Sequence, residues 1–405
     1  MSTLKAYKYR LYPSKRQCEK LQETLDRVRE LYNAAIQERR YAYRMCRVSL
    51  SYNQQSAQLP EIKKLREEYH GIHSQVLQDT LRRVEKAFKA FFRRIKEGQT
   101  PGFPRFKGRD HFDSFTYPQT GFSLTEDSRV CLSKIGTIKV KMHRDLQGTI
   151  KTCTVKREGA HWFIVFVCEA EQKVVSRPSG EAVGIDLGLL HFATLSDGST
   201  IENPRYLRKA EQRLARAQQA VSRKKLGSKR RKKAGRLVGK MHRKVSNRRN
   251  DFLQKASRKL ITTYVIIVFE KLASVNLSKR PKPKKDEATG VYLSNGARAK
   301  AGLNKSIQDA GWRQFVQHCQ NKAEEAGSRV LLVDPKYTSQ ICSGCGAIQK
   351  KSLDERWHSC SCGCELDRDH NAAMNILRLG LQALETETQA RTEPSEYAPL
   401  RSLRL

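Results

Sequence analysis

Two short segments of this sequence are almost entirely apolar and end in a carboxylate. AVGID (182–186) ends at Asp186, and VIIVFE (265–270) ends at Glu270. An apolar run without polar alternation predicts a strand covered on both faces, as the central strands of α/β sheets are. An acid at the tip of such a strand must be solvated or paired, because burying an isolated carboxylate is costly. The two segments therefore predict an α/β sheet with acids gathered at one edge.

A third acidic position follows near the C-terminus. Asp367 and Asp369 precede NAAMNI (371–376), which predicts a helix over about Asp369–Leu379. Carboxylates from two strands and a helix have a ready partner in hard divalent cations, which take oxygen ligands. Two such ions can clamp the attacking and leaving oxygens of a phosphodiester displacement. The alternative is that each acid is an ordinary cap or surface residue, but three together favour metal binding.

The cysteines form a second cluster. Five of the eleven lie between 342 and 364, in CSGCG (342–346) and SCSCGCE (359–365). Two close pairs at this spacing predict a structural zinc site and a reducing compartment, not a disulfide framework. Cys342 and Cys345 form the first half of the site. In the second half Cys360, Cys362 and Cys364 compete for two places, and His358 is a possible substitute ligand.

The charge of the chain identifies its class of partner. Lys and Arg number 78 against 41 Asp and Glu, a net charge of +37. A merely solubilising surface rarely needs such an excess, so the balance predicts binding to nucleic acid. Residues 205–249 hold 19 Lys plus Arg and one acid, Glu211, yet keep an apolar stripe at helical spacing. We expect phosphate contacts in this region from Arg223, Lys224, Lys225, Arg230, Arg231, Lys232 and Lys233.

The N-terminal half predicts strands interrupted by helices. Leu4–Tyr12 alternates as a strand, and Ser14 with Gln17 forms a capping box for a helix. A second helix over Ser74–Ile95 carries a sustained apolar stripe, with Gln78 and Arg82 on the opposite side as candidates for nucleic-acid contact. The strands expected after the Pro/Gly-rich stretch 100–108 form a small antiparallel barrel, and we expect the first strand to join it. They are Phe112–Tyr117, Val130–Leu132, Thr137–Met142, Thr149–Val155 and Trp162–Glu169.

Beyond the first apolar strand the pattern predicts mostly helices. Helices are expected over 205–226, 236–260 and 305–326, with a strand at 330–333. The polar segment 273–303 predicts a mobile loop, and the tail from about Ala383 predicts disorder. No apolar run reaches the ~20 residues that span a bilayer, and the N-terminus lacks a secretory h-region. We therefore expect a cytoplasmic protein without a membrane partner.

The motifs together resemble the TnpB family, transposon-encoded RNA-guided DNA endonucleases that are similar to the ancestors of type V CRISPR effectors. The resemblance rests on GIDLGL (184–189), VFEKL (268–272), CSGCG (342–346) and DRDHNAAMNI (367–376). RLYPSKRQ, RELYN, AFKAFFRR, GFPRFK, AGW and YTSQIC follow the family order along nearly the whole chain.

The resemblance implies a multidomain α/β protein in which a nuclease domain of the RuvC/RNase H type contains an inserted zinc ribbon. Residues 181–335 and 367–382 would form the nuclease domain, and 336–366 the zinc ribbon that binds target nucleic acid. Residues 1–13 and 101–180 would form a β-barrel wedge domain, 14–100 an inserted helical recognition domain, and 383–405 a disordered tail. The implied catalytic triad is Asp186, Glu270 and Asp369, which would hold two Mg²⁺ ions, with Asp367 as a neighbour.

One departure concerns the zinc ligands. The family usually shows C-x-x-C-G in the second half of the site, whereas position 359 here is Ser and Cys364 is extra. We predict one Zn²⁺ on Cys342, Cys345, Cys360 and Cys362, with Cys364 in reserve.

The implied activity is cleavage of double-stranded DNA next to a short target-adjacent motif, guided by an RNA derived from the transposon end. Such a protein would act on the nucleoid of a bacterial or archaeal cell. The sequence does not indicate whether it is a monomer or a dimer. The alternative is an RNA-guided repressor without nuclease activity, which the presence of all three acids disfavours. A transposase that moves DNA itself is a weaker third reading, because no tyrosine nucleophile lies in a His-rich metal context.

Overall fold

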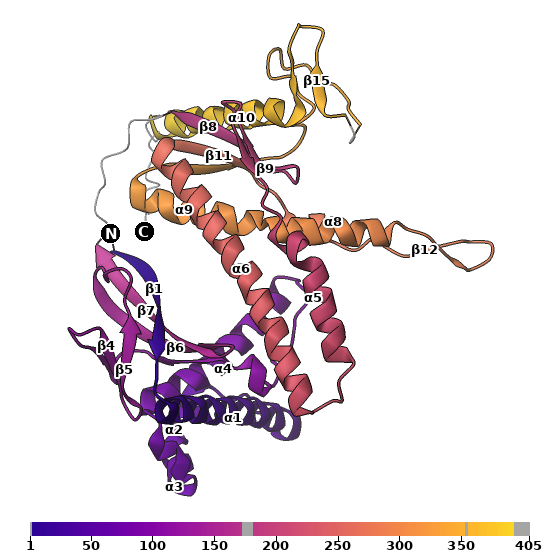
Figure 1. The fold of residues 1–405 in the computed structure, drawn as a ribbon. Coiled ribbons are helices and arrows are strands. Elements are labelled where there is room, and N and C mark those ends of the chain that lie inside the picture. The colour runs from indigo at the N-terminus through magenta and orange to yellow at the C-terminus, as the bar shows by residue number, and fades with distance from the viewer. Residues whose placement is uncertain (1, 172–180, 353–354, 393–405) are drawn as a thin grey trace, which may run out of the picture. The chain divides into compact units, whose positions relative to one another are not determined.

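The chain folds into two compact units, Met1–Gln172 and Lys173–Leu405. The computed structural model describes residues 2–171, 181–352 and 355–392 (Figure 1). No helix in this described part of the chain is long and apolar enough to cross a membrane. The boundary between the units lies close to the predicted start of the nuclease domain at residue 181.

The first unit contains a seven-stranded antiparallel sheet. Its strands are β1 (Ser2–Tyr12), β2 (Ser114–Tyr117), β3 (Phe122–Leu124), β4 (Arg129–Leu132), β5 (Gly136–Lys141), β6 (Thr149–Glu158) and β7 (His161–Glu171), in the order β2-β6-β7-β1-β5-β4-β3. The first strand joins the later ones, as predicted, because β1 pairs with β7 and β5. No ladder among the described residues joins β2 to β3, so the predicted barrel is observed as an open sheet. Strand β3 was not predicted.

The helices of the first unit lie between β1 and β2 in the chain. They are α1 (Lys15–Cys46), α2 (Tyr52–Ala57), α3 (Leu59–Leu65), α4 (Ser74–Lys96) and the short 3₁₀ turns η1 (Glu67–Gly71) and η2 (Arg109–His111). The predicted capping box is present, with the Ser14 hydroxyl accepting from Gln17 N–H and the Gln17 side chain accepting from Ser14 N–H. One hydrophobic core joins helices and sheet, with Leu21 of α1, Leu77 of α4 and Tyr9 of β1 all buried.

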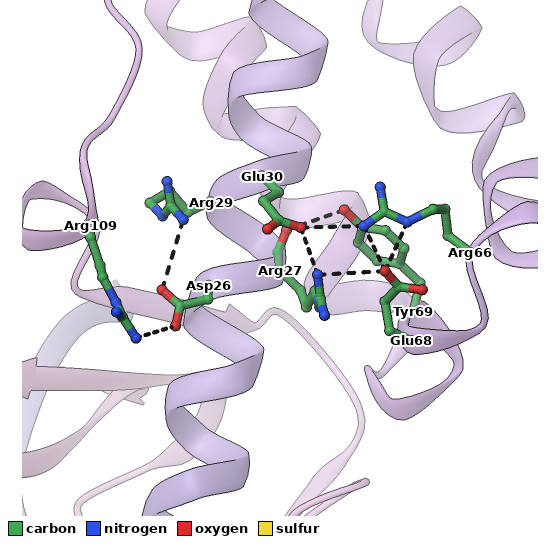
Figure 2. A network of polar contacts seen from close by, with 8 residues as sticks. All are labelled: Asp26, Arg27, Arg29, Glu30, Arg66, Glu68, Tyr69 and Arg109. Carbon is green, nitrogen blue, oxygen red and sulfur yellow. Dashed lines mark hydrogen bonds and ion pairs between the residues drawn. The ribbon is translucent and has the colours of Figure 1, made fainter.

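A network of ion pairs fixes the N-terminal half of α1 to its neighbours (Figure 2). Arg66 Nη2 lies 2.6 Å from Glu68 Oε1 and 3.5 Å from Glu30 Oε2. Arg109 Nη2 reaches Asp26 Oδ2 at 3.0 Å from the segment before β2. Asp26 and Glu30 of α1 are therefore already paired with arginines of the same unit.

The second unit is built on a five-stranded mixed sheet. Its strands are β8 (Ala182–Asp186), β9 (His191–Leu195), β10 (Thr200–Glu202), β11 (Ile266–Glu270) and β14 (Arg329–Val333), in the order β10-β9-β8-β11-β14. β8 pairs antiparallel with β9, and β9 with β10, whereas β11 runs parallel to both β8 and β14. The prediction that the two apolar segments are central strands is confirmed, because β8 and β11 are neighbours inside the sheet.

The second unit also contains the helices α5 (Tyr206–Ser222), α6 (Lys229–Thr263), α7 (Ser274–Leu277), α8 (Ala297–Ala310), α9 (Trp312–Ala326) and α10 (Arg368–Thr392). Helix α10 covers one face of the sheet, and α6 and α9 cover the other. Alternate residues of β11 face opposite sides: Phe269 packs with α6 and α9, whereas Val268 packs with Ile376 of α10. The strand is therefore buried on both faces, which explains its lack of polar alternation. Figure 1 shows α10 running along the strands on one side and α6 and α9 on the other.

Three expectations for this unit are wrong in detail. The predicted helix 305–326 is two helices, because Gly311 takes a left-handed conformation (φ 72°) and ends α8. The segment 273–303, predicted as a mobile loop, contains α7, the hairpin β12 (Lys284–Lys285) and β13 (Tyr292–Leu293), and the first turns of α8. Helix α10 continues through 383–392, predicted as disordered, and the remaining tail lies outside the described residues.

Candidate functional site

The three predicted catalytic acids come from two strands and one helix of the second unit. Strands β8 and β11 are parallel and in register, with Phe269 opposite Ile185. Asp186 and Glu270 follow these residues, so both carboxylates lie at the same edge of the sheet. Asp369 lies in the first turn of α10, which packs on β8.

The absence of side chains at two glycines allows α10 to lie this close to the sheet. A Cβ at Gly184 of β8 would come within 2.1 Å of the Ala373 carbonyl oxygen and 2.5 Å of the Leu377 nitrogen. A Cβ at Gly380 would come within 2.4 Å of Val268 Cγ2. The backbones of helix and strand therefore approach directly, which holds the N-terminal turn of α10, and Asp369, beside the edge of the sheet.

The electrostatics of the acids reflect burial and mutual repulsion. Burial raises the pKa of Asp186 well above its usual range, and the charges of Glu270 and Asp369 raise it further, while Arg368 acts in the opposite direction. Burial also raises the pKa of Glu270, opposed by the Thr338 hydroxyl, which donates to Glu270 Oε1 at 2.5 Å. Like charges confined in a partly buried site favour either protonation or a bound cation.

Asp367 differs from the three acids because its side chain caps a helix. Its Oδ1 accepts hydrogen bonds from the backbone N–H groups of Asp369 (2.8 Å) and His370 (3.3 Å). These are two of the donors that the start of an α-helix leaves without intrahelical partners. Asp367 therefore caps α10 and orients the turn that carries Asp369, while Arg368 Nε lies 3.7 Å from Asp369 Oδ1.

The three carboxylates lie farther apart than the sulfur atoms of the cysteine cluster. Among the described residues, the three carboxylates do not form a group whose ligand atoms all lie within 4.8 Å of one another. A site for two ions ~4 Å apart does not require this, because each ion contacts a different subset of the carboxylates. Oxygen donors of like charge at one edge of the sheet fit hard divalent cations.

The sulfur atoms of four cysteines do form such a group. The Sγ atoms of Cys342, Cys345, Cys360 and Cys362 all lie within 4.8 Å of one another. The Cys342–Cys362 and Cys345–Cys360 sulfur distances are both 3.6 Å. Zn–S bonds of ~2.3 Å in a tetrahedron place sulfurs ~3.8 Å apart, so this set fits a zinc ion. The cluster can therefore bind zinc through the four cysteines chosen from the sequence.

The environment of Cys342 favours the thiolate that a metal requires. Burial acts to raise its pKa, but hydrogen bonds from the backbone N–H of Cys345, from His358 and from the backbone of Gly344 lower the pKa of Cys342 to about 5. A second possible group consists of Cys342, His358 and Cys364. This second group offers three ligands, whereas the first offers four thiols. Its His358 is buried, and His358 Nδ1 lies 2.5 Å from Lys351 Nζ.

Two buried asparagines, whose part the sequence did not indicate, connect the cysteine cluster to α10. Asn375 Nδ2 donates to the carbonyl oxygens of Thr338 (3.0 Å) and Ile341 (2.7 Å). Asn371 Nδ2 also donates to Ile341 O, and its Oδ1 accepts from Ser343 N–H at 2.9 Å. Their spacing of one helical turn places both amides on one face of α10, the signal that could have found them. The segment that Asn375 holds also contains Thr338, whose hydroxyl donates to Glu270 Oε1.

The predicted phosphate-contacting residues of α5 and α6 divide into two groups. Arg231 Nη1 donates to the carbonyl oxygens of Val221 (3.1 Å) and Lys224 (3.0 Å), and Lys224 Nζ donates to Ala220 O at 3.1 Å. These two side chains therefore satisfy carbonyls at the end of α5. The other five are exposed: Arg223, Lys225, Arg230, Lys232 and Lys233.

Gln78 and Arg82 lie on α4 of the first unit. Gln78 is half-buried, and Arg82 is exposed with its guanidinium 5.3 Å from the Tyr52 ring centre. Arg82 is thus oriented by an aromatic face, an arrangement that leaves its charge available to solvent.

Three family models match the chain. Residues 165–280 match OrfB_IS605, described as "Probable transposase", and residues 312–376 match "Cas12f1-like, TNB domain". The second match covers α9, β14, the cysteine cluster and the first turns of α10. Residues 1–46 match "Helix-turn-helix domain", although in the structure they form strand β1 and the single helix α1.

Relatives along almost the whole chain carry one description. "Putative RNA-guided DNA endonuclease InsQ" of Escherichia coli (strain K12) is 33% identical over 94% of this chain and 93% of its own length. "Putative RNA-guided DNA endonuclease" of Streptomyces pristinaespiralis is 34% identical over 94% of this chain and 90% of its own length. Proteins of Acanthamoeba polyphaga mimivirus named TnpB-like also match.

Among solved structures, "Cryo-EM structure of CasPhi-2 (Cas12j) bound to crRNA" is 11% identical and covers 94% of this chain and 98% of that one, with a TM-score of 0.45. A likeness at this level carries no argument about function. The sequence matches that extend over 94% of the chain identify its family, and they agree with the sequence motifs. The chain belongs to the TnpB family of transposon-encoded proteins.

Proposed function

We propose that this protein is an RNA-guided DNA endonuclease that cleaves double-stranded DNA at the acidic edge of its five-stranded sheet. The observation that carries the proposal is the meeting of Asp186, Glu270 and Asp369 there, with the charges of the other two acids raising the pKa of Asp186. In a chain of net charge +37, a partly buried cluster of acids would be repelled by DNA unless cations bind between them. The names of the relatives agree with this activity.

The site would work through the positions that its own residues hold. Asp186 and Glu270, from adjacent parallel strands, would bind two Mg²⁺ ions together with Asp369. When bound, these ions supply charge stabilisation for the attacking and leaving oxygens of a phosphodiester. Thr338 holds Glu270 in one orientation by donating to its Oε1, and Asp367 holds the first turn of α10 by capping it. In this proposal the protein domain is of the RuvC type, and the sheet order with β8 in its centre supports that assignment.

The cysteine cluster would act as a structural module beside this site. A zinc ion held by Cys342, Cys345, Cys360 and Cys362 would fix the 342–364 segment, which Asn371 and Asn375 connect to α10. The order of this segment then determines how Thr338, and through it Glu270, is placed. The module therefore couples zinc binding to the geometry of the acids, and it would also contact target nucleic acid.

The nucleic-acid partners would be a guide RNA from the transposon end and a target DNA. Pairing between the two supplies sequence specificity, while the protein contributes phosphate contacts and reads a short adjacent motif. The exposed cations Arg223, Lys225, Arg230, Lys232 and Lys233 are suited to phosphate contact. The protein would act in the cytoplasm of a bacterial or archaeal cell, on nucleoid DNA. The repressor alternative finds no support in the site, because all three acids are present.

The test begins with the RNA that co-purifies with the full-length protein. Sequencing this RNA identifies the guide, and a plasmid library with a matching target and a randomised flank identifies the adjacent motif. We expect Mg²⁺-dependent cleavage of matching plasmids and none of plasmids mismatched next to the motif. A protein that carries no discrete RNA, or that cuts irrespective of match, would contradict the proposal.

A further inference from the structure

A large aromatic cavity lies in the first unit, apart from the acids and the cysteines. Its volume is about 790 Å³, within the ~300–1,000 Å³ of ligand sites. Seven of its thirteen lining residues are aromatic, three are arginines and none is acidic. The aromatic ones are Tyr41, Tyr43, Phe88, Phe91, Phe92, Phe103 and Phe106.

The cavity exists because the apolar stripe of α4 extends beyond its packing partners. Leu77, Leu81 and Val84 are buried in the core of the first unit. Further along the same helix, Phe92 is 60% exposed and Ile95 is 49% exposed. The sequence predicted one sustained apolar stripe along α4, whereas in the structure its later members Phe88 and Phe91 line the cavity together with Phe92. Large apolar side chains gathered at the surface mark a binding site more often than chance exposure.

The rings around the cavity hold one another in place. The Phe103 ring lies 5.3 Å from Phe91 and 5.7 Å from Phe88, both edge to face. The Arg40 guanidinium lies 5.9 Å from the Phe103 ring centre and 5.5 Å from that of Phe106. Aromatic faces and arginine planes are the two surfaces on which unpaired nucleobases stack.

Two of the three arginines around the cavity lack an ion-pair partner among the described residues, whereas Arg39 Nη1 lies 2.8 Å from Glu85 Oε2. In the N-terminal half of α1, Arg27 and Arg29 face Glu30 and Asp26, as Figure 2 shows. At the cavity, the exposed Arg40 and Arg44 form no ion pair within the part of the chain that the structure describes. The same helix therefore pairs Arg27 and Arg29 with acids, but leaves Arg40 and Arg44 without an acidic partner among the described residues. An occupant with negative charge beside flat apolar groups is complementary to this wall.

We infer that this cavity binds unpaired nucleobases of the protein's RNA, with their phosphates against Arg40 and Arg44. The inference rests on the proposed function, because that function supplies a resident RNA. Paired bases in a guide–target duplex are stacked on one another and present no free face, so single-stranded loops or ends of the RNA are the suitable occupant. A neutral apolar peptide would fill the cavity but leave both arginines without a counter-charge.

The location of the RNA is tested by crosslinking on the protein–RNA complex as purified. Cells expressing the protein incorporate 4-thiouridine, the complex is irradiated without target DNA, and crosslinked peptides are identified by mass spectrometry. We expect RNA-linked peptides from residues 37–50 and 88–106. RNA crosslinks confined to other segments would overturn the inference.

The energetic contribution is tested by removing rings and not charges. The Tyr43→Ala/Phe92→Ala variant should bind the purified RNA at least fivefold more weakly, as expected for lost base stacking. Its salt dependence should stay that of the wild type, because no phosphate contact is removed. Phe92→Leu keeps an apolar side chain and should still weaken binding, which separates stacking from a folding defect.

The matched control is Tyr12→Ala. Tyr12 is 51% exposed and lies under the Arg10 guanidinium at 5.4 Å, but it is outside the cavity. It should leave RNA affinity unchanged. Equal affinities for wild type and the double variant would overturn the inference, as would a wild-type dimer that Phe92→Leu converts to monomer. Neither readout requires cleavage, so a failure of the proposed nuclease activity is distinguishable from a failure here.

Discussion

The contact between β8 and α10 offers a mechanical test of how the acids are positioned. In Gly184→Ala, the added Cβ would lie 2.1 Å from the Ala373 carbonyl oxygen. Real Cβ atoms keep at least 3.0 Å from such atoms, so helix and strand must separate by about 0.9 Å. The obstructing atoms belong to the backbone, and therefore no side-chain rotation relieves the overlap.

The size of the effect follows from this displacement. Overpacking of this kind costs about 1–3 kcal/mol of the free energy of unfolding. Asp369 moves with α10, and a misplacement of ~1 Å in a catalytic group can reduce a rate about 100-fold. We therefore expect a lowered melting temperature together with a cleavage rate ~100-fold below that of the wild type, while RNA binding stays unchanged.

The assay is single-turnover cleavage of a matching plasmid, with thermal unfolding measured in parallel. Gly239→Ala in α6 is the control, because a Cβ there meets nothing within 4 Å. That change should leave cleavage intact and slightly stabilise the helix, by roughly 0.5–1 kcal/mol. Wild-type cleavage and stability in Gly184→Ala would refute the account of how α10 is positioned.

Three further predictions concern the surrounding structure. Cys360→Ser should remove most of the bound zinc, as measured by mass spectrometry of the metal, whereas Cys364→Ser should retain it; the opposite result would exchange the two ligands. Asn375→Ala removes the side-chain donor of the Thr338 carbonyl oxygen and leaves the Ile341 oxygen with Asn371 alone, and it should lower the free energy of unfolding by about 1–3 kcal/mol, seen as a shift of the denaturant midpoint. Lys232→Ala should weaken nucleic-acid binding and reduce the salt slope by about one without changing stability, whereas Arg231→Ala should destabilise the end of α5; thermal unfolding and titrations at several salt concentrations distinguish the two.

The positions of Asp186 and Glu270 at strand ends could be predicted from the sequence, because the pattern that indicates them is local. An apolar run that ends in a carboxylate, such as the one ending at Asp186, indicates a buried strand and its exposed edge together. The capping box at Ser14 and Gln17 is equally local, and it is present. The spacing of the cysteines likewise predicted that the sulfur atoms of the two Cys pairs lie close together, as they do in the structure.

The features that sequence reasoning missed depend on tertiary contact. Asn375 resembles any polar helix residue until the carbonyl groups of the neighbouring segment are placed beside it. Gly311 lies in a continuous helical pattern, and only its left-handed conformation ends α8. The stripe of α4 shows that Ile95 lies on the apolar face, but not that the packing partners end before it. Periodicity indicates which face of a helix is apolar, and not how far along its length that face is covered.

The central claim is that three particular carboxylates perform the cleavage. The most direct measurement compares the single-turnover cleavage rates of Asp186→Asn and Asp367→Asn, with RNA binding measured for both. Asp186→Asn should abolish cleavage and leave RNA binding intact. Asp367→Asn should cleave at a rate near that of the wild type, because Asn also caps helices well. Cleavage that survives in Asp186→Asn with Mg²⁺ present, or that is lost only in Asp367→Asn, would contradict the account.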